Sequence, residues 1–76
     1  MKEMLEIMIK NLVGKPEVVE ITEKQKGNTT IYEVKVDESD MGKVIGRQGR
    51  IAKSIRTVAK AIATKEDKKI SIEFVG

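Results

Sequence analysis

The chain has no cysteine and no histidine. It therefore cannot form a disulfide, and it lacks both the thiolate and the imidazole that hold most protein-bound zinc. It also lacks the side chain that most often acts as a general base near neutral pH. Only two of its 76 residues are aromatic, Tyr32 and Phe74, so a row of rings for stacking nucleobases is excluded. We expect a protein that is not an enzyme and needs no metal and no cofactor.

Long apolar runs are lacking as well. No stretch approaches the roughly 20 apolar residues that a membrane-spanning helix needs. Charged side chains at Lys2, Glu3 and Glu6 interrupt the region where a secretory signal would be apolar. Nothing in the 76 residues resembles a linker, a repeat or a low-complexity tract. We expect one small domain over residues 1–76, no membrane association and a cytoplasmic location.

The charged residues, 36% of the chain, are distributed unevenly. Residues 1–40 carry a net charge of −3, whereas residues 41–76 carry +6. No acid interrupts the cations between residues 41 and 62, which are Lys43, Arg47, Arg50, Lys53, Arg56 and Lys60. An ordinary solvated helix face mixes both signs, so this clustering indicates a polyanionic partner.

The spacing of apolar residues and the turn signals predict six elements. In chain order they are a helix over residues 2–13, strands over 18–23 and 30–36, a short helix over about 40–45, a long helix over 50–63 and a strand over 70–74. Gly14 is expected to end the first helix, and Asp37 or Ser39 to cap the short one. The order α-β-β-α-α-β predicts an α+β fold, with a three-stranded sheet and helices packed on one face.

The long helix carries two apolar patterns. A narrow stripe of large residues, Ile51, Ile55, Val58 and Ile62, is expected to face the core. Three alanines, Ala52, Ala59 and Ala63, line one flank and permit close packing. We favour packing of these alanines inside the chain, while a seam between two copies remains an alternative.

The run from residue 42 to 51, GKVIGRQGRI, is the most informative stretch. Gly46-Arg47-Gln48-Gly49 forms a G-x-x-G turn between the two later helices. Gly46 can end one helix with a positive φ, and Gly49 leaves the start of the next helix unobstructed. This arrangement predicts a clamp for a sugar–phosphate backbone. The expected backbone contacts are Lys43, Gly46, Arg47, Gln48, Gly49, Arg50 and Lys53, with Lys60 extending the positive field.

Bases next to such a clamp would need an apolar surface. The candidates are Val36, Val44, Ile45 and Ile51. Some of them must belong to the core, and the sequence alone leaves the division open.

The string from Val44 to Gly49 resembles the signature of KH domains, whose G-x-x-G loop clamps about four nucleotides. The longer string from Asp40 to Lys53 resembles small bacterial single-KH-domain proteins, the KH-domain protein A family. The likeness covers the whole chain, with the G-x-x-G core region at about residues 30–76. One departure is Ala52, because many KH domains have a large apolar residue three positions after the second glycine.

That resemblance implies a type II KH fold and a cytoplasmic protein that binds single-stranded RNA. It also implies an RNA chaperone or post-transcriptional regulator linked to cell shape. The implied partner is a second copy of the chain or a larger KH-containing RNA-binding protein.

Other motifs that contain glycine match this sequence less well. The spacing of Gly42, Gly46 and Gly49 matches neither a P-loop nor a dinucleotide fingerprint. A helix-turn-helix is disfavoured because the first of its two helices is short and strands flank the pair. Two alternatives stay open, namely a single-stranded DNA binder and a protein-interaction module that dimerises.

Overall fold

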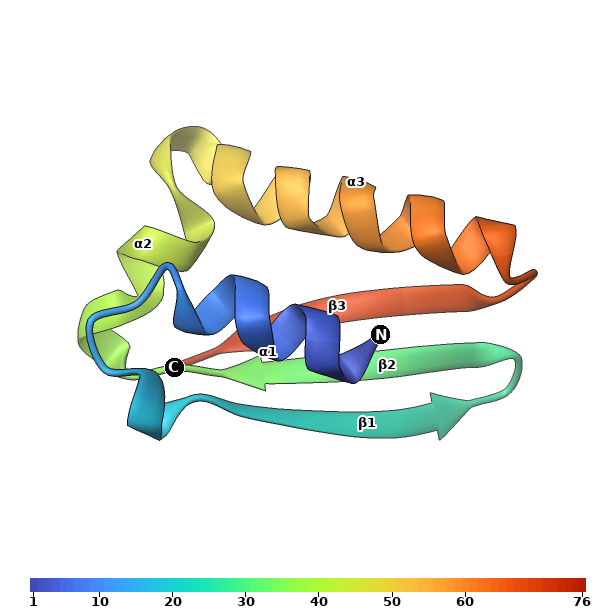
Figure 1. Cartoon of the computed structure of the whole chain (residues 1–76), viewed down its shortest axis with the longest axis horizontal. Coiled ribbons are helices and arrows are strands. Elements are labelled where there is room, and N and C mark those ends of the chain that lie inside the picture. The colour runs from blue at the N-terminus through green and yellow to red at the C-terminus, as the bar shows by residue number, and fades with distance from the viewer.

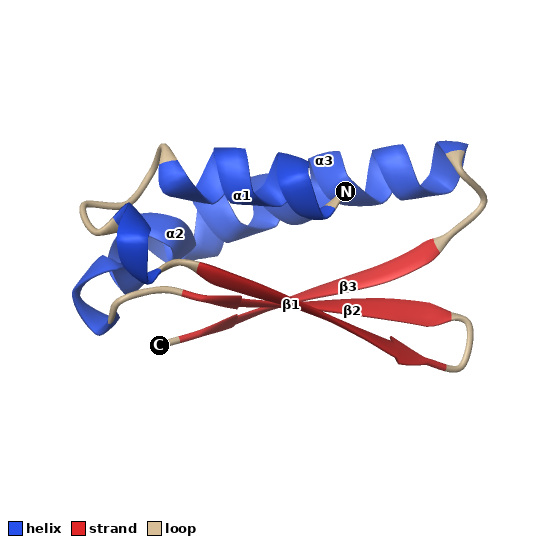
Figure 2. Cartoon of the chain, turned by 60° about the horizontal axis from the view of Figure 1, so that its bottom comes forward, coloured by secondary structure: helices blue, strands red, loops and turns tan.

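A three-stranded sheet forms one layer of the structure, and the helices cover one of its faces (Figure 1, Figure 2). The computed structural model describes all residues 1–76. Its helices and strands are α1 (Lys2–Lys10), β1 (Glu20–Lys26), β2 (Thr29–Lys35), α2 (Met41–Ile45), α3 (Arg50–Lys65) and β3 (Lys69–Val75). Short 3-10 turns occur at Pro16–Val18, Glu38–Asp40 and Arg47–Gly49. The predicted order and fold class are confirmed.

The strands lie in the order β1-β2-β3, with β1 antiparallel to β2 and β2 parallel to β3. A parallel pair needs a crossover connection, and α2 and α3 provide it. Lys26 pairs with Thr29, so the hairpin turn is only Gly27-Asn28, with φ +61° at Gly27. The strands expected over 18–23 and 30–36 leave a connection of six residues, which is wrong, because residues 24–26 continue β1 and Thr29 already belongs to β2. Residues 24–26 are polar and exposed, and Ile21 is the only buried residue of β1, so no apolar alternation marks this part of the strand. Backbone pairing with β2 extends β1 through these residues.

The core lies between the sheet and the helices. Its largest fully buried apolar side chains are Leu5, Ile9, Val34, Val36 and Val44. Tyr32, Val34 and Val36 all face this core, as their alternation predicts. None of the helices combines the length and the apolar character that a bilayer-spanning segment requires.

Helix α3 faces the sheet with its small residues. Its buried residues are Ala52, Ile55, Ala59 and Ala63. Val58 is 46% exposed, and Ile51 and Ile62 are only partly buried. The expected core stripe is therefore wrong for Val58, whereas packing of the alanines inside the chain is confirmed. Small side chains let the helix axis approach the sheet closely. With the alanines facing the sheet, the large residues Ile51, Val58 and Ile62 lie at the edge of the interface.

The end of α1 also differs from the expectation. The helix stops at Lys10, and Gly14 lies beyond it. The backbone N–H groups of Gly14 and Lys15 donate to the two carboxylate oxygens of Asp40, both at 3.0 Å. The two N–H donors lower the pKa of the Asp40 carboxyl, and the donor of Gly14 has the larger effect. Asp40 is almost fully buried, with 2% of its surface exposed. Asp40 therefore joins the α1–β1 connection to the start of α2.

Asp37 caps the 3-10 turn that precedes α2, whereas α2 itself begins after Asp40 without a side-chain capping hydrogen bond, so the predicted cap lies one short turn earlier than expected. Asp37 accepts a hydrogen bond from the backbone N–H of Ser39 at 3.0 Å. The hydroxyl of Ser39 lowers the pKa of the Asp37 carboxyl most, and the backbone N–H of Ser39 lowers it further. This cap fixes the direction in which the chain enters α2, and so the position of the turn that follows.

Candidate nucleic-acid interface

The bend between α2 and α3, residues 46–49, is the G-x-x-G loop. Gly46 ends α2, with its N–H donating to the carbonyl of Gly42 at 2.9 Å. Its backbone angles, φ 76° and ψ 176°, fall in a region that is essentially restricted to glycine. Gln48 and Gly49 also have positive φ, 55° and 71°. Three positive φ angles within four residues make the bend tight.

The two glycines of the loop have different surroundings. A Cβ atom at Gly46 would lie 2.6 Å from Cγ1 of Ile51, so the next helix packs directly on this glycine. A Cβ atom at Gly49 would meet nothing within 4 Å. Gly46 is therefore required by packing and by backbone conformation, whereas Gly49 leaves open space in front of the first turn of α3.

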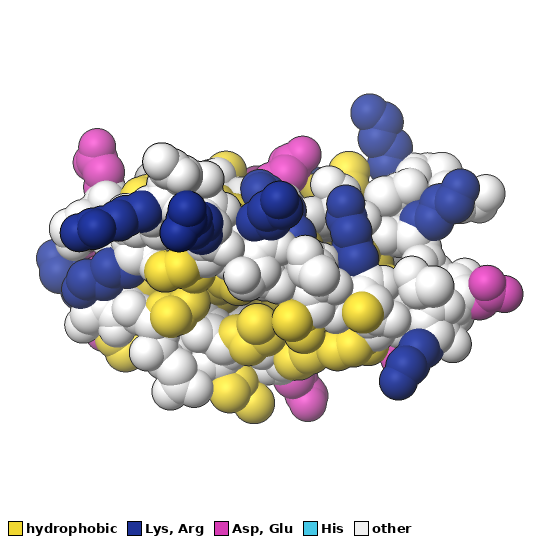
Figure 3. Space-filling model, turned by 90° about the horizontal axis from the view of Figure 1, so that it is seen from above, with side chains coloured by type: hydrophobic (Ala, Val, Ile, Leu, Met, Phe, Trp, Pro, Cys, Tyr) yellow, Lys and Arg dark blue, Asp and Glu magenta, His cyan; other side chains and the backbone are white.

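The polar side chains proposed from the sequence are all exposed around this bend. Lys43, Arg47, Gln48, Arg50 and Lys53 belong to this group. Figure 3 shows Lys and Arg side chains in a row along the helix layer, beside a band of hydrophobic side chains. Of the four cations, only Lys43 has an acidic partner, with its ammonium 3.3 Å from Oδ1 of Asp40. The loop thus presents mainly uncompensated positive charge.

The four apolar candidates divide into two pairs. Val36 and Val44 are 1% and 0% exposed, so they support the loop from inside the core and cannot contact a ligand. Ile45 and Ile51 are partly buried and retain some surface. Only the second pair remains available as a surface beside the loop.

An apolar groove of about 390 Å³ separates α1 from α3. It is lined by Met8, Leu12, Arg50, Ile51, Ser54, Ile55 and Val58. Leu12 and Val58 are 37% and 46% exposed along it. The groove is built by two segments that are distant in the sequence. It was not predicted from the sequence, because Val58 was expected to face the core.

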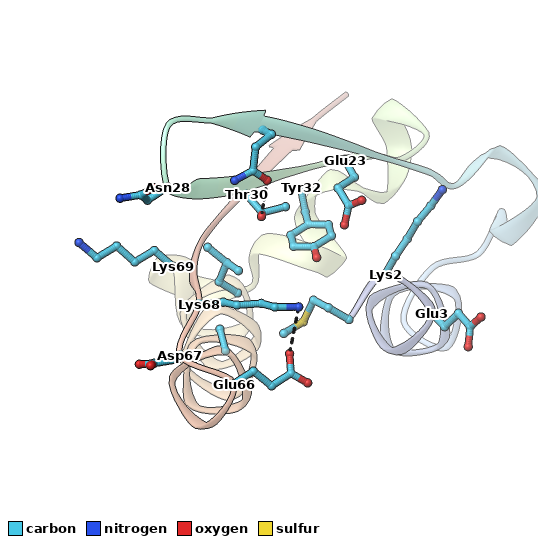
Figure 4. A pocket seen from close by; sticks show the side chains of 14 residues that line it. Lys2, Glu3, Glu23, Asn28, Thr30, Tyr32, Glu66, Asp67, Lys68 and Lys69 are labelled. Carbon is cyan, nitrogen blue, oxygen red and sulfur yellow. Dashed lines mark hydrogen bonds and ion pairs between the residues drawn. The ribbon is translucent and has the colours of Figure 1, made fainter.

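A second, polar cavity of about 930 Å³ is lined by residues near the β1–β2 hairpin and the end of α3 (Figure 4), at the opposite end of the molecule from the bend between α2 and α3 (Figure 1). Charges of both signs surround it, including Lys2, Glu23 and the Lys68–Glu66 ion pair at 3.8 Å. Tyr32 points into it, and burial, followed by the effect of Glu23, raises the pKa of Tyr32 to about 12. Mixed charges give this cavity no attraction for a polyanion.

Arg56 differs from the exposed cations of the row. Its Nε–H donates to the carbonyl of Ile72 at 3.2 Å, and its guanidinium carbon lies 5.3 Å from the centroid of the Phe74 ring. In the sequence Arg56 is only one of six cations, because its partners in β3 are 16 and 18 residues away. No sequence periodicity links these positions.

The parallel β2–β3 pair, its crossover through α2 and α3, and the G-x-x-G bend between these helices define a KH domain of the type II arrangement. A model of the KhpA/KhpB KH domain matches residues 2–74. The chain therefore belongs to the KhpA/KhpB family of KH-domain proteins.

Relatives with high identity span the same length. "RNA-binding protein KhpA" of Clostridium perfringens is 56% identical over 75 residues, which cover 99% of this chain and 100% of the relative. The protein of the same name from Chlamydia trachomatis is 47% identical, over 99% of this chain and 96% of its own. That from Listeria monocytogenes (serovar 1/2a) is 45% identical, over 99% of both. No solved structure gives a significant match.

Proposed function

We propose that this chain binds single-stranded RNA, with the sugar–phosphate backbone against the G-x-x-G loop. The observation that carries the proposal is a tight, side-chain-poor bend next to the start of α3, surrounded by exposed cations with few acidic partners. The relatives are named as RNA-binding proteins, which supports the same ligand. A cytoplasmic location, taken from the family resemblance, belongs to the same proposal.

The exposed side chains around the loop can make different contacts with the RNA. Arg47 can hold a phosphate with its planar donor fork, and Gln48 can donate to a phosphate or sugar oxygen. Arg50 and Lys53 add charge along the first turn of α3. Lys43 contributes less than Arg47, because the Asp40 carboxylate already neutralises part of its charge. Ile45 and Ile51 offer apolar contact to the adjacent bases.

A double charge reversal tests the site. Arg47→Asp with Gln48→Asp should abolish binding of an unstructured oligoribonucleotide in a fluorescence-anisotropy titration, with the melting temperature nearly unchanged. Lys26→Asp with Asn28→Asp in the distant hairpin makes the same change in charge and should bind like the wild type. Equal binding by the loop variant would reject the site. Tighter binding of single-stranded DNA of the same sequence would replace RNA by DNA as the ligand.

A second proposal concerns self-association. We propose that the apolar groove between α1 and α3 holds a second copy of this chain, or the KH domain of a larger partner, as the family resemblance implies. Two linked modules would bind RNA more tightly than one through effective concentration. Val58→Asp should reduce the molar mass measured by size exclusion with light scattering, whereas Thr57→Asp, on the same helix outside the groove, should not. A monomeric wild-type protein would reject the homodimer.

The role as an RNA chaperone or regulator is a further part of the proposal. It predicts that the protein accelerates annealing of two complementary RNA hairpins, and that the loop variant does not. Unchanged annealing rates with saturating wild-type protein would limit the function to binding.

A further inference from the structure

Helix α3 and strand β3 meet at the free edge of the sheet. β3 pairs only with β2, so its other edge has no neighbouring strand. Arg56 reaches from α3 to this edge and donates its Nε–H to the carbonyl of Ile72. The same guanidinium lies over the ring of Phe74. Two contacts of different kinds thus fix one side chain.

These contacts leave part of the guanidinium unused. Nε is engaged by Ile72, and the guanidinium carbon lies over the Phe74 ring, within the distance at which a cation is attracted by an aromatic face. The four N–H bonds of the two terminal nitrogens have no partner within the protein, since Arg56 appears in no other hydrogen bond and in no ion pair. Arg56 is a partly buried cation without a carboxylate, and its second face is not covered by an aromatic ring.

The position of Arg56 relates it to the G-x-x-G loop. It lies seven residues after Gly49, the residue that precedes α3, a rise of about 10 Å along the helix axis. This distance suits a base whose own backbone, or that of the next nucleotide, is held at the loop. Lys53 lies between the two points on an exposed turn of α3 and keeps the intervening surface positive.

We propose that Arg56, supported from behind by Phe74, is the stacking platform for one base of the bound RNA strand. This inference rests on the proposed function. Arginine planes stack on bases in single-stranded RNA recognition, and a rigid, pre-positioned plane loses little freedom on binding. The platform supplies a π-type contact in a chain whose only other aromatic residue, Tyr32, is buried in the core. The base stacks on the outer face of the guanidinium, and the terminal N–H groups of the guanidinium donate to the edge of the base.

The test separates stacking from charge. Arg56→Lys keeps the charge but removes the plane. The probes are an unstructured oligoribonucleotide of mixed sequence and the same backbone carrying abasic residues throughout. We expect Arg56→Lys to lower affinity for the base-bearing strand by a factor on the order of ten, to leave affinity for the abasic strand unchanged, and to leave the salt dependence unchanged. Lys65→Gln, at the exposed far end of α3, should bind both strands like the wild type.

Other results would overturn the inference. Equal losses on both strands, or a smaller salt slope, would make Arg56 a phosphate contact, and an unaltered affinity would remove it from the site. If the loop variant still loses binding in those cases, the proposed function survives. A wild-type protein that binds no RNA would overturn both.

A measurement on the wild-type protein tests stacking independently of any folding defect in the Arg56→Lys variant. The Nε–H resonance of Arg56 in an NMR spectrum should shift on addition of the base-bearing strand, through the ring current of the stacked base, and not on addition of the abasic strand. An identical response to both strands would contradict stacking even if Arg56→Lys melted at a lower temperature.

Discussion

Replacing Gly46 by alanine would test how the G-x-x-G loop is held in place. The new Cβ atom would lie 2.6 Å from Cγ1 and 2.9 Å from Cβ of Ile51. It would also have to adopt φ 76° and ψ 176°, which side chains rarely allow. Gly49 is the matched position, because it shares a positive φ and has open space around it.

The magnitudes follow from these two terms. The backbone conformation at residue 46 costs about 1–3 kcal/mol for alanine, and relief of the overlap with Ile51 costs about 1–3 kcal/mol more. We therefore expect Gly46→Ala to lose about 4 kcal/mol, and Gly49→Ala to lose about 1–2 kcal/mol from its backbone conformation alone. A domain of this size has a total free energy of unfolding of about 4–11 kcal/mol. Gly46→Ala should thus be close to unfolding.

Urea denaturation followed by circular dichroism measures these losses. Ile51→Ala removes the Cγ1 and Cδ1 atoms that the new methyl group would strike, but not the Cβ atom at 2.9 Å. In that background, Gly46→Ala should cost about 1–2 kcal/mol less than in the wild type. Equal losses for Gly46→Ala and Gly49→Ala, or additive effects of Gly46→Ala and Ile51→Ala, would refute the packing argument.

Three further predictions concern the core and the titratable groups. At a protein concentration where the chain is monomeric, Val58→Asn should change the free energy of unfolding by less than about 0.5 kcal/mol, whereas Ile55→Ala, one turn earlier, should lose about 2–5 kcal/mol in the same urea experiment. A large loss at Val58 in the monomer would contradict its exposure. Because the pKa of Tyr32 is raised from 10.0 to about 12, its contribution to stability should be full below pH 10.0 and decline as the pH rises toward 12. Tyr32 is the only tyrosine, so ultraviolet absorbance reports its ionisation directly, and a midpoint near the ordinary value would be inconsistent with burial. Because the pKa of Asp40 is lowered from 3.8, its contribution to the free energy of unfolding should be present above pH 3.8 and disappear on acidification below that value. Asp40→Asn should therefore melt at a lower temperature than the wild type at neutral pH, and its stability should fall less on acidification. An unchanged melting temperature would argue against the role of Asp40 in holding the α1–β1 connection.

The element order was predictable because each element has a local signal. Apolar spacing marks α1 and α3, alternation marks β2 and β3, and glycine marks the loop. The positive φ at Gly46 was likewise predictable, since the position that ends a helix at a tight bend favours glycine whatever surrounds it. The exposure of Arg47 and Gln48 follows from their place at the tip of the bend.

The features that could not be predicted depend on partners distant in the sequence. Periodicity shows that α3 has an apolar side, but not which edge of that side meets the sheet, because alanine and isoleucine both count as apolar. The helix rotates toward the alanines, and Val58 is left outside. The extension of β1 to Lys26 depends on its register with β2. Asp40 stands at the start of α2, and no local pattern indicates that its carboxylate holds the backbone of residues 14 and 15.

The rotation of α3 also explains how the proposed stacking platform arises. With Ala52, Ala59 and Ala63 against the sheet, the helix lies close enough for a side chain on its flank to reach the backbone of β3. Arg56 is on that flank, and Val58 falls on the other side, where it lines the groove with α1. Larger residues at the alanine positions would move α3 outward and separate Arg56 from Ile72 and Phe74. The small residues of the core thus determine both surfaces, the edge that we assign to RNA bases and the groove that we assign to a partner.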